Sequence, residues 1–214
     1  MDHVRRVPCQ SDPVRPTLDH VRGRSLPGEP AAGFARAIGR LRAVPLRPEV
    51  CLTEVPAPQR IAPYAVALSA EVVGVAGEAE LASGRFVLLH DPTCPEPWEG
   101  DWRAVTFARA EMEWEVATDP SLGEVGWAWL TDALAAREVP YLAEAGTVTR
   151  VVSESFGSLA DRAARVELEV RASWTPVDHR HLAEHLLAWS DLLCTLAGLP
   201  PLPEGVVALP GPRR

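Results

Sequence analysis

The sequence contains no lysine and no asparagine, and all 21 of its basic residues are arginines. It also lacks an apolar run of the roughly 18 to 20 residues that a membrane-spanning helix needs, and no apolar stretch follows the N-terminal arginines as in a signal peptide. These absences predict a soluble, cytoplasmic protein with no membrane partner. With 47% hydrophobic and 23% charged residues, the 214-residue chain has the balance of a globular protein.

Cysteine is scarce, and one sign of charge dominates. Cys9, Cys51, Cys94 and Cys194 lie far apart and form no C-x-x-C pair, which favours reduced thiols over a disulfide framework or a zinc site.

The formal net charge of −8 repels nucleic acid at long range, so nucleic acid is not expected as a partner. Neither a glycine-rich phosphate loop nor a G-x-S-x-G elbow is present, and the sequence therefore indicates no cofactor.

Proline marks both ends of the chain. Residues 1–30 contain five arginines, four acids and five prolines without a hydrophobic period, and residues 201–214 are also rich in proline. We expect both segments to be disordered tails. The intervening residues 31–200 are predicted to form a single α+β domain.

Hydrophobic periodicity within this domain predicts three helices and about five or six strands. The expected elements, in order, are a helix between Pro30 and Pro45, an edge strand at 49–55, strands at 64–72, 85–90 and 103–114, a helix at 119–137, strands at about 147–155 and 165–174, and a helix at about 178–197. Proline-containing and glycine-containing turns separate the strands. The fold class is therefore α+β, with an antiparallel sheet and the order α-β-βββ-α-ββ-α.

Tryptophans mark the predicted core and a weak internal repeat. Trp174 ends the alternating strand 165–174, and Trp189 lies on the apolar stripe of the last helix, so both are expected to be core anchors. A shift of 60 residues places Trp114 on Trp174 and Trp129 on Trp189. This match indicates a duplicated ββα unit. The alternative is that any strand leading into an amphipathic helix needs an aromatic residue at these places.

Several strings resemble those of a known family. They are Glu54–Pro63 (EVPAPQRIAP), Leu88–Pro92 (LLHDP), Gly126–Leu134 (GWAWLTDAL), Ala172–Pro176 (ASWTP) and Trp189–Cys194 (WSDLLC). Over roughly residues 31–200 the chain resembles a family of uncharacterised actinobacterial proteins, the domain-of-unknown-function family DUF3000. This resemblance implies no activity, cofactor or catalytic residue. The element order separately resembles the type III secretion chaperone-like fold, whose members are often dimeric protein-binding modules.

One string matches a metal motif. His181-Leu182-Ala183-Glu184-His185 has the H-x-x-E-H spacing in which two histidines hold zinc and the glutamate acts as a base. A third ligand is missing, because Glu204 is the only acid after the last helix and lies in the proline-rich tail. We therefore expect no stoichiometric metal, and a partly exposed helix face instead.

Two other polar clusters have the residue types of a functional site. His90, Asp91 and Cys94 follow a predicted strand, but the prolines around them indicate a turn in which Asp91 hydrogen-bonds the loop backbone. The second cluster is a basic surface near the first helix. Its arginines are expected to be solvated or to pair with an acidic strand end; these residues are Arg36, Arg40, Arg42 and Arg47, and Glu111, Glu113 and Glu115.

The helix at 119–137 is apolar over about 200°, twice the stripe of roughly 100° that packing on one sheet face requires. If Leu122 and its neighbours pack on the sheet, Trp127, Leu130 and Leu134 need another cover, either a partner chain or the first helix or segment 56–63 of the same chain. We therefore predict a non-catalytic protein-binding or adaptor module, with these three as candidate partner-binding residues and a protein or second copy as partner. The alternatives are a nucleic-acid-associated accessory protein and a metal-dependent hydrolase.

Overall fold

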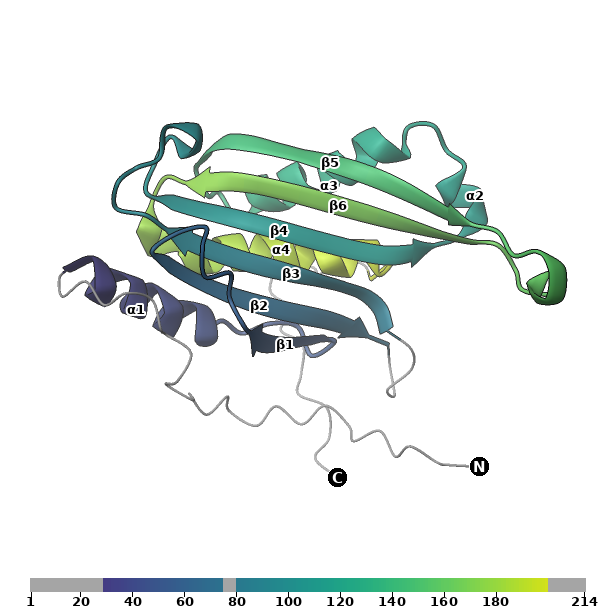
Figure 1. Ribbon diagram of the computed structural model, residues 1–214, viewed down its shortest axis with the longest axis horizontal. Helices are drawn as coiled ribbons and strands as arrows, with labels where there is room; N and C mark the ends of the chain where they lie inside the picture. The colour runs from purple at the N-terminus through teal and green to yellow at the C-terminus, as the bar shows by residue number, and fades with distance from the viewer. Residues whose placement is uncertain (1–28, 75–79, 200–214) are drawn as a thin grey trace, which may run out of the picture.

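A computed structural model describes residues 29–74 and 80–199 (Figure 1). The described residues form a six-stranded sheet in the order β1-β2-β3-β4-β6-β5, in which all neighbouring strands are antiparallel. The predicted α+β class and antiparallel sheet are confirmed. The tails predicted at 1–30 and 201–214 lie outside the described residues, except that Glu29 and Pro30 begin the first helix.

The helices and strands follow the predicted order, with one short helix added. They are α1 (Glu29–Arg42), β1 (Val50–Val55), β2 (Tyr64–Val73), β3 (Glu80–His90), β4 (Trp102–Met112), α2 (Trp114–Ala117), α3 (Leu122–Ala136), β5 (Tyr141–Ser153), β6 (Arg165–Pro176) and α4 (Leu182–Leu196), with 3₁₀ turns η2 (Glu96–Trp98), η3 (Gly157–Leu159) and η4 (His179–His181). β5 begins earlier than predicted because Tyr141 already pairs with Pro176. A bulge between Leu142 and Ala145 interrupts its alternation there.

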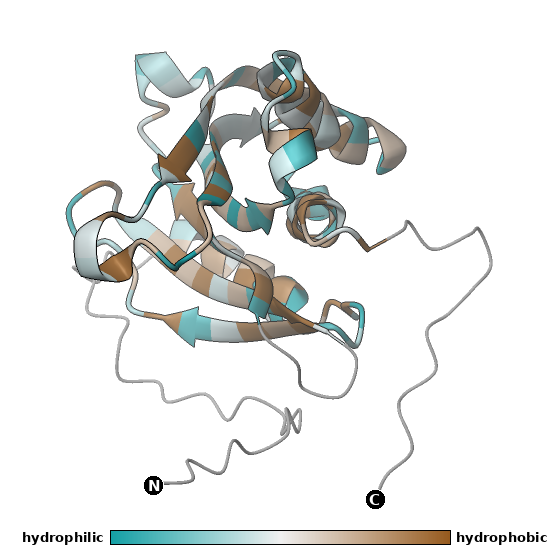
Figure 2. Cartoon of the chain, turned by 90° about the vertical axis from the view of Figure 1, so that its right-hand side faces the viewer, coloured by the Kyte–Doolittle hydropathy of each residue, from teal (hydrophilic) through white to brown (hydrophobic). Residues whose placement is uncertain are grey.

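The helices cover one face of the sheet. In Figure 1, α3 and α4 lie behind the strands, and α1 lies beside β2. Side chains alternate along each strand, so β6 directs Val166, Leu168 and Val170 into the core and Arg165, Glu167 and Glu169 to the opposite face. The sheet is twisted, as the different directions of its strands show in Figure 2.

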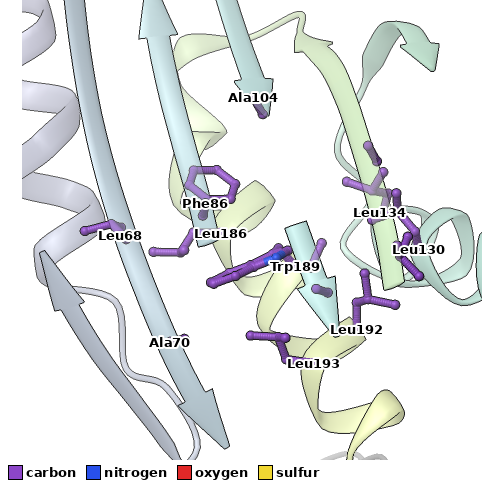
Figure 3. Packing of buried hydrophobic residues seen from close by; sticks show 14 of the residues in the cluster. Leu68, Ala70, Phe86, Ala104, Leu130, Leu134, Leu186, Trp189, Leu192 and Leu193 are labelled. Carbon is purple, nitrogen blue, oxygen red and sulfur yellow. The ribbon is translucent and has the colours of Figure 1, made fainter. Parts of the chain in front are cut away.

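Trp189 of α4 lies at the centre of the core (Figure 3). Its ring centroid is 5.8 Å from that of Phe86, and its Nε1 donates a 3.2 Å hydrogen bond to the backbone carbonyl of Phe107. Gly84 makes this approach possible, because a Cβ there would come within 2.8 Å of the indole. Trp174 and Trp189 are both 0% exposed, which confirms that they are core residues.

The order of elements repeats a ββα unit, β3-β4-α3 and then β5-β6-α4. The bounds of α3 and α4 differ by 60 residues, and β4 and β6 are neighbours in the sheet. Trp129 and Trp189 therefore hold equivalent helix positions. Trp114 and Trp174 do not, since Trp114 lies on α2 and is 47% exposed.

The cysteines depart in part from the expectation of reduced thiols. Cys51 on β1 is disulfide-bonded, so the expectation is wrong at this position. Cys94 and Cys194 are free thiols, as expected. Within residues 29–74 and 80–199, no helix has the length and apolar character needed to cross a bilayer.

Candidate functional site

The two histidines of the H-x-x-E-H string have different surroundings. His181 lies at the surface, with its Nδ1 3.2 Å from a carboxylate oxygen of Asp178. His185 is fully buried, and its Nδ1 accepts a 3.1 Å hydrogen bond from Nε1 of Trp174. In the described part of the chain, no three His, Cys, Asp or Glu residues are grouped to hold a metal ion. The absence of a stoichiometric metal remains a prediction, which elemental analysis of the purified protein tests.

The expectation of a partly exposed helix face is wrong for His185. Burial lowers the pKa of this imidazole to about 4, and the nearby His181 shifts it in the same direction. Because Nδ1 accepts from Trp174, the neutral ring carries its hydrogen on Nε2, which has no hydrogen-bond partner among the described residues. His185 is thus a neutral core residue that orients Trp174.

The His90 cluster does not converge on a site either. The His90 ring stacks on Trp102 at a centroid distance of 4.2 Å, and its Nδ1 lies 3.0 Å from the backbone carbonyl of Asp101. Asp91 accepts hydrogen bonds from the backbone N–H and the hydroxyl of Thr93, at 3.0 and 2.8 Å. The predicted loop role of Asp91 is therefore confirmed. Cys94 is exposed and directs its Sγ toward the carbonyl of Pro92.

Three of the four arginines of the basic surface, Arg40, Arg42 and Arg47, are bonded within the chain, but not to the acidic strand end. Arg42 forms a 2.8 Å ion pair with Glu54 of β1, and Arg47 lies 3.4 Å from Glu49. Arg40 donates to the backbone carbonyl of Arg180. Of the two expected arrangements, pairing with Glu111, Glu113 and Glu115 is therefore wrong for these three arginines. The solvated face agrees with the exposure of Arg36, Arg40 and Arg42, whereas Arg47 is half-buried.

Two of the three candidate partner-binding residues on α3 are core residues. Leu130 and Leu134 are each 1% exposed, and the sheet covers them (Figure 3). The buried stripe of α3 is Leu122, Gly126, Leu130 and Leu134, so the helix is rotated relative to the predicted orientation. Neither a partner nor segment 56–63 is needed to cover the two leucines. Trp127 remains half-buried, and its ring lies against Gly146 of β5.

The open face, by which we mean the sheet face opposite α3 and α4, contains a hollow of about 940 Å³. The strand register aligns one residue from each of β2, β3, β4, β6 and β5 across its centre. This central row consists of Ser69, Arg85, Phe107, Arg171 and Thr147. In Figure 1 the open face of the sheet is turned toward the viewer, because α3 and α4 lie behind the strands. A row of smaller, mostly apolar side chains lies beside the central row, with Val87, Val105, Ser173 and Ala145.

Arginines set the electrostatics of the hollow. The Arg171 guanidinium lies 5.2 Å from the ring centroid of Phe107 and 2.7 Å from a carboxylate oxygen of Glu169. On the other side of Phe107, the side chain of Arg85 is exposed, and it has no hydrogen bond or ion pair with any described residue. The hollow therefore presents a cation without a direct ion-pair partner in the described chain beside an aromatic ring, and Glu71 also lines the hollow.

One end of the open face is closed by a buried arginine. Arg103 of β4 is 8% exposed, and burial lowers its pKa. Its Nη1 donates to the Ala143 carbonyl at 2.9 Å and to the Thr175 hydroxyl at 3.1 Å, while its Nη2 donates to the Ser173 hydroxyl at 2.7 Å. The connection at 56–63 also passes in front of this end of the sheet in Figure 1. Arg103 thus joins β4, β5 and β6 rather than facing a ligand.

Analysis of the sequence alone missed the open face, although one signal for it was present. In β4, Arg103, Val105, Phe107 and Arg109 alternate with buried residues. The residues of each strand that point toward the helices predicted the core, but no site was predicted from the residues that point away from the helices. Their grouping into one hollow depends on the register of the strands and on the absence of helices from this face, and neither is encoded in a single strand.

A family model described as "Protein of unknown function (DUF3000)" matches residues 30–207. No curated protein and no solved structure matches the chain.

Proposed function

This chain belongs to the DUF3000 family, and because the family description assigns no function, we propose one from the geometry of the chain itself: a non-catalytic module that holds an extended segment of a partner protein against its open face. One observation carries this proposal. The helices that the structure describes cover one face of the sheet, while the other face presents a hollow of about 940 Å³ with Arg85 and Phe107 at its centre. Hollows of this size accommodate several side chains or a small ligand.

The residues of the hollow favour binding over catalysis. Among the described lining residues there is no histidine, cysteine or aspartate. The two glutamates are Glu71 and Glu80, and Glu80 lies 3.8 Å from Arg109. Arginine, serine, threonine and valine side chains bind charged and apolar groups, but they do not by themselves supply a base–nucleophile pair.

The rows of the open face indicate the chemistry of the segment. Arg85 and Val87 lie two residues apart on β3, about 6.8 Å along the strand direction. An extended segment places its alternate side chains at the same spacing. A segment with an acidic residue followed two positions later by an apolar one therefore complements Arg85 and the valine row.

Nucleic acid fits the open face less well. Single-stranded nucleic acids bind to sheets by stacking bases on exposed aromatic rings. Arg171 already occupies one side of the Phe107 ring, and Glu169 accompanies it. The protein segment is therefore the occupant that we propose.

Site-specific crosslinking tests this proposal. A photoreactive amino acid at Val105, which is 38% exposed on the open face, is expected to capture protein from native lysate, whereas the same group at exposed Ala135 on α3 is not. Arg85→Glu should abolish the Val105 adducts, and Arg36→Glu on α1 should leave them unchanged. Equal adducts from Val105 and Ala135, or adducts that nuclease removes, would refute a protein-binding open face.

A further inference from the structure

β5 leaves a long edge of the sheet without a strand partner. This strand runs from Tyr141 to Ser153 and pairs only with β6 (Figure 1). Within residues 29–74 and 80–199, no strand pairs with the outer backbone N–H and C=O groups of β5. Most of its side chains are exposed, including Val151 at 37% and Val152 at 55%. Natural proteins usually shorten such edges or protect them with proline and charge.

The opposite edge of the sheet has this protection, and β5 does not. β1 is only six residues long, with Pro48 shortly before it and Pro56 directly after it. In contrast, residues 146–153 contain no proline and one charged residue, Arg150. The Nη1 of Arg150 donates to the backbone carbonyls of Ala117 and Asp119, at 3.1 and 3.0 Å, so its charge is directed back onto its own chain.

We infer that the β5 edge joins two copies of this chain, by antiparallel pairing of β5 with β5 of a second copy. Residues 146–153 contain none of the 29 acidic residues, so two chains of net charge −8 can approach each other there with least repulsion. The stretch is rich in valine and threonine, which favour strands. Pairing an edge with itself about a twofold axis also closes the assembly at two copies.

Charge and the bulge together select a register. The regular ladder begins at Ala145, after the bulge. A twofold axis at Thr149 would place Glu144 opposite Glu154 of the other copy, whereas an axis at Val148 places Thr147 opposite Thr149 and Ala145 opposite Val151. No like charges then face each other along residues 145–151. We therefore place the axis at Val148.

Exposed apolar residues at the two ends of β5 support the same arrangement. Leu142 is 43% exposed near the start of the strand, and Phe156 is 77% exposed just after its end. Antiparallel pairing brings the end of one β5 toward the start of the other, so each Phe156 approaches a Leu142 of the second copy. Trp127, half-buried against Gly146, lies beside the axis on the helix side. Both open faces then lie on the same side of one continuous sheet.

Light scattering on the full chain tests this inference. At concentrations of about 10 to 100 μM, the range of many reversible dimers, the wild type should have twice the 23.2 kDa mass of one chain. Thr147→Glu/Thr149→Glu and Thr147→Lys/Thr149→Lys each place like charges opposite each other and should raise the dimer Kd by about tenfold or more. An equimolar mixture of the two variants should restore the dimer, because each glutamate then faces a lysine.

The controls separate this edge from other surfaces. Thr53→Lys, on the exposed part of β1, should leave the dimer unchanged, and circular dichroism should show that all variants are folded. A monomeric wild type would overturn the inference and leave the edge for a strand of another protein. A dimer that persists in both double variants, or one that the mixture does not restore, would overturn the β5 pairing.

Discussion

Acidification from pH 7 to pH 4.5 should destabilise this protein by about 2.5 kcal/mol through His185 alone. The imidazole is buried on α4 and neutral, with a folded-state pKa of about 4, against 6.5 for an unperturbed histidine. A base with a lowered folded-state pKa is charged more readily in the unfolded chain. Its stabilising effect is therefore complete above pH 6.5, is lost as the pH falls from 6.5 to 4, and does not change further below pH 4.

The magnitude follows from the two pKa values. The full difference of the two pKa values corresponds to roughly 3.4 kcal/mol, at 1.36 kcal/mol for each pH unit. At pH 4.5, the unfolded histidine is almost fully protonated, whereas only about a quarter of the folded molecules carry the proton. About 2.5 of the roughly 3.4 kcal/mol that His185 contributes to the free energy of unfolding is therefore lost by pH 4.5.

Urea unfolding at pH 7 and pH 4.5 measures this loss, with His185→Gln as the matched variant. The glutamine carbonyl can still accept the hydrogen bond from Trp174, but it does not titrate. Other titrating groups are common to both proteins, so their effects on the free energy of unfolding cancel in the comparison. One of them is Asp178, whose carboxyl pKa the Arg180 side chain lowers. The wild type should lose about 2.5 kcal/mol more than His185→Gln between the two pH values. Equal losses would refute a buried, neutral His185.

Three further experiments test the packing. Trp189→Ala should lower the free energy of unfolding, measured in a urea melt, by about 3 to 5 kcal/mol. Trp114→Ala, on the exposed α2, should lower it by less than about 1 kcal/mol. Similar losses for the two variants would contradict the core position of Trp189. Leu134→Glu should abolish the native circular dichroism spectrum, because it places a charge in the core. If this variant were instead a folded monomer and the wild type a dimer, Leu134 would be an interface residue. Arg103→Met should cost about 2 to 4 kcal/mol, because it removes three hydrogen bonds from β4 to the strands β5 and β6. Arg85→Met should cost less than about 0.5 kcal/mol, and equal effects would argue against the anchoring role of Arg103.

Patterns that are local in the sequence predicted most of the fold. Alternation in residues 165–174 defined β6 and its buried face, and the prolines around residues 49–55 placed β1 at an edge. β5 was less predictable at its start, because the bulge and the positive φ of Ala143 interrupt alternation just where the strand begins. Residue spacing cannot reveal such an interruption before the pairing is known.

The candidate site was less predictable than the fold because it depends on orientation and register. On α3, a helix apolar over about 200° can turn either of two groups toward the sheet, and the sequence did not decide between them. In the structure, the side of α3 that contains Gly126 faces the sheet, because the glycine allows Val148 and Leu168 to approach the helix closely. The central row of the open face likewise combines Arg85, Phe107 and Arg171 from strands that are distant in the sequence.

The position of α4 has a consequence for synthesis of the chain. The helix supplies Trp189 to the middle of the core, contacts α1, α3 and the two strands β3 and β4, and ends only at Leu196. A ribosome therefore completes the whole β1–β4 meander long before the residue that fills its core has been made. Until then the nascent strands expose apolar side chains that include Leu68, Phe86 and Leu88. α1, which packs on α4, also lacks these contacts until α4 has been synthesised. The core between this sheet face and α4 can therefore close only after α4 has been synthesised.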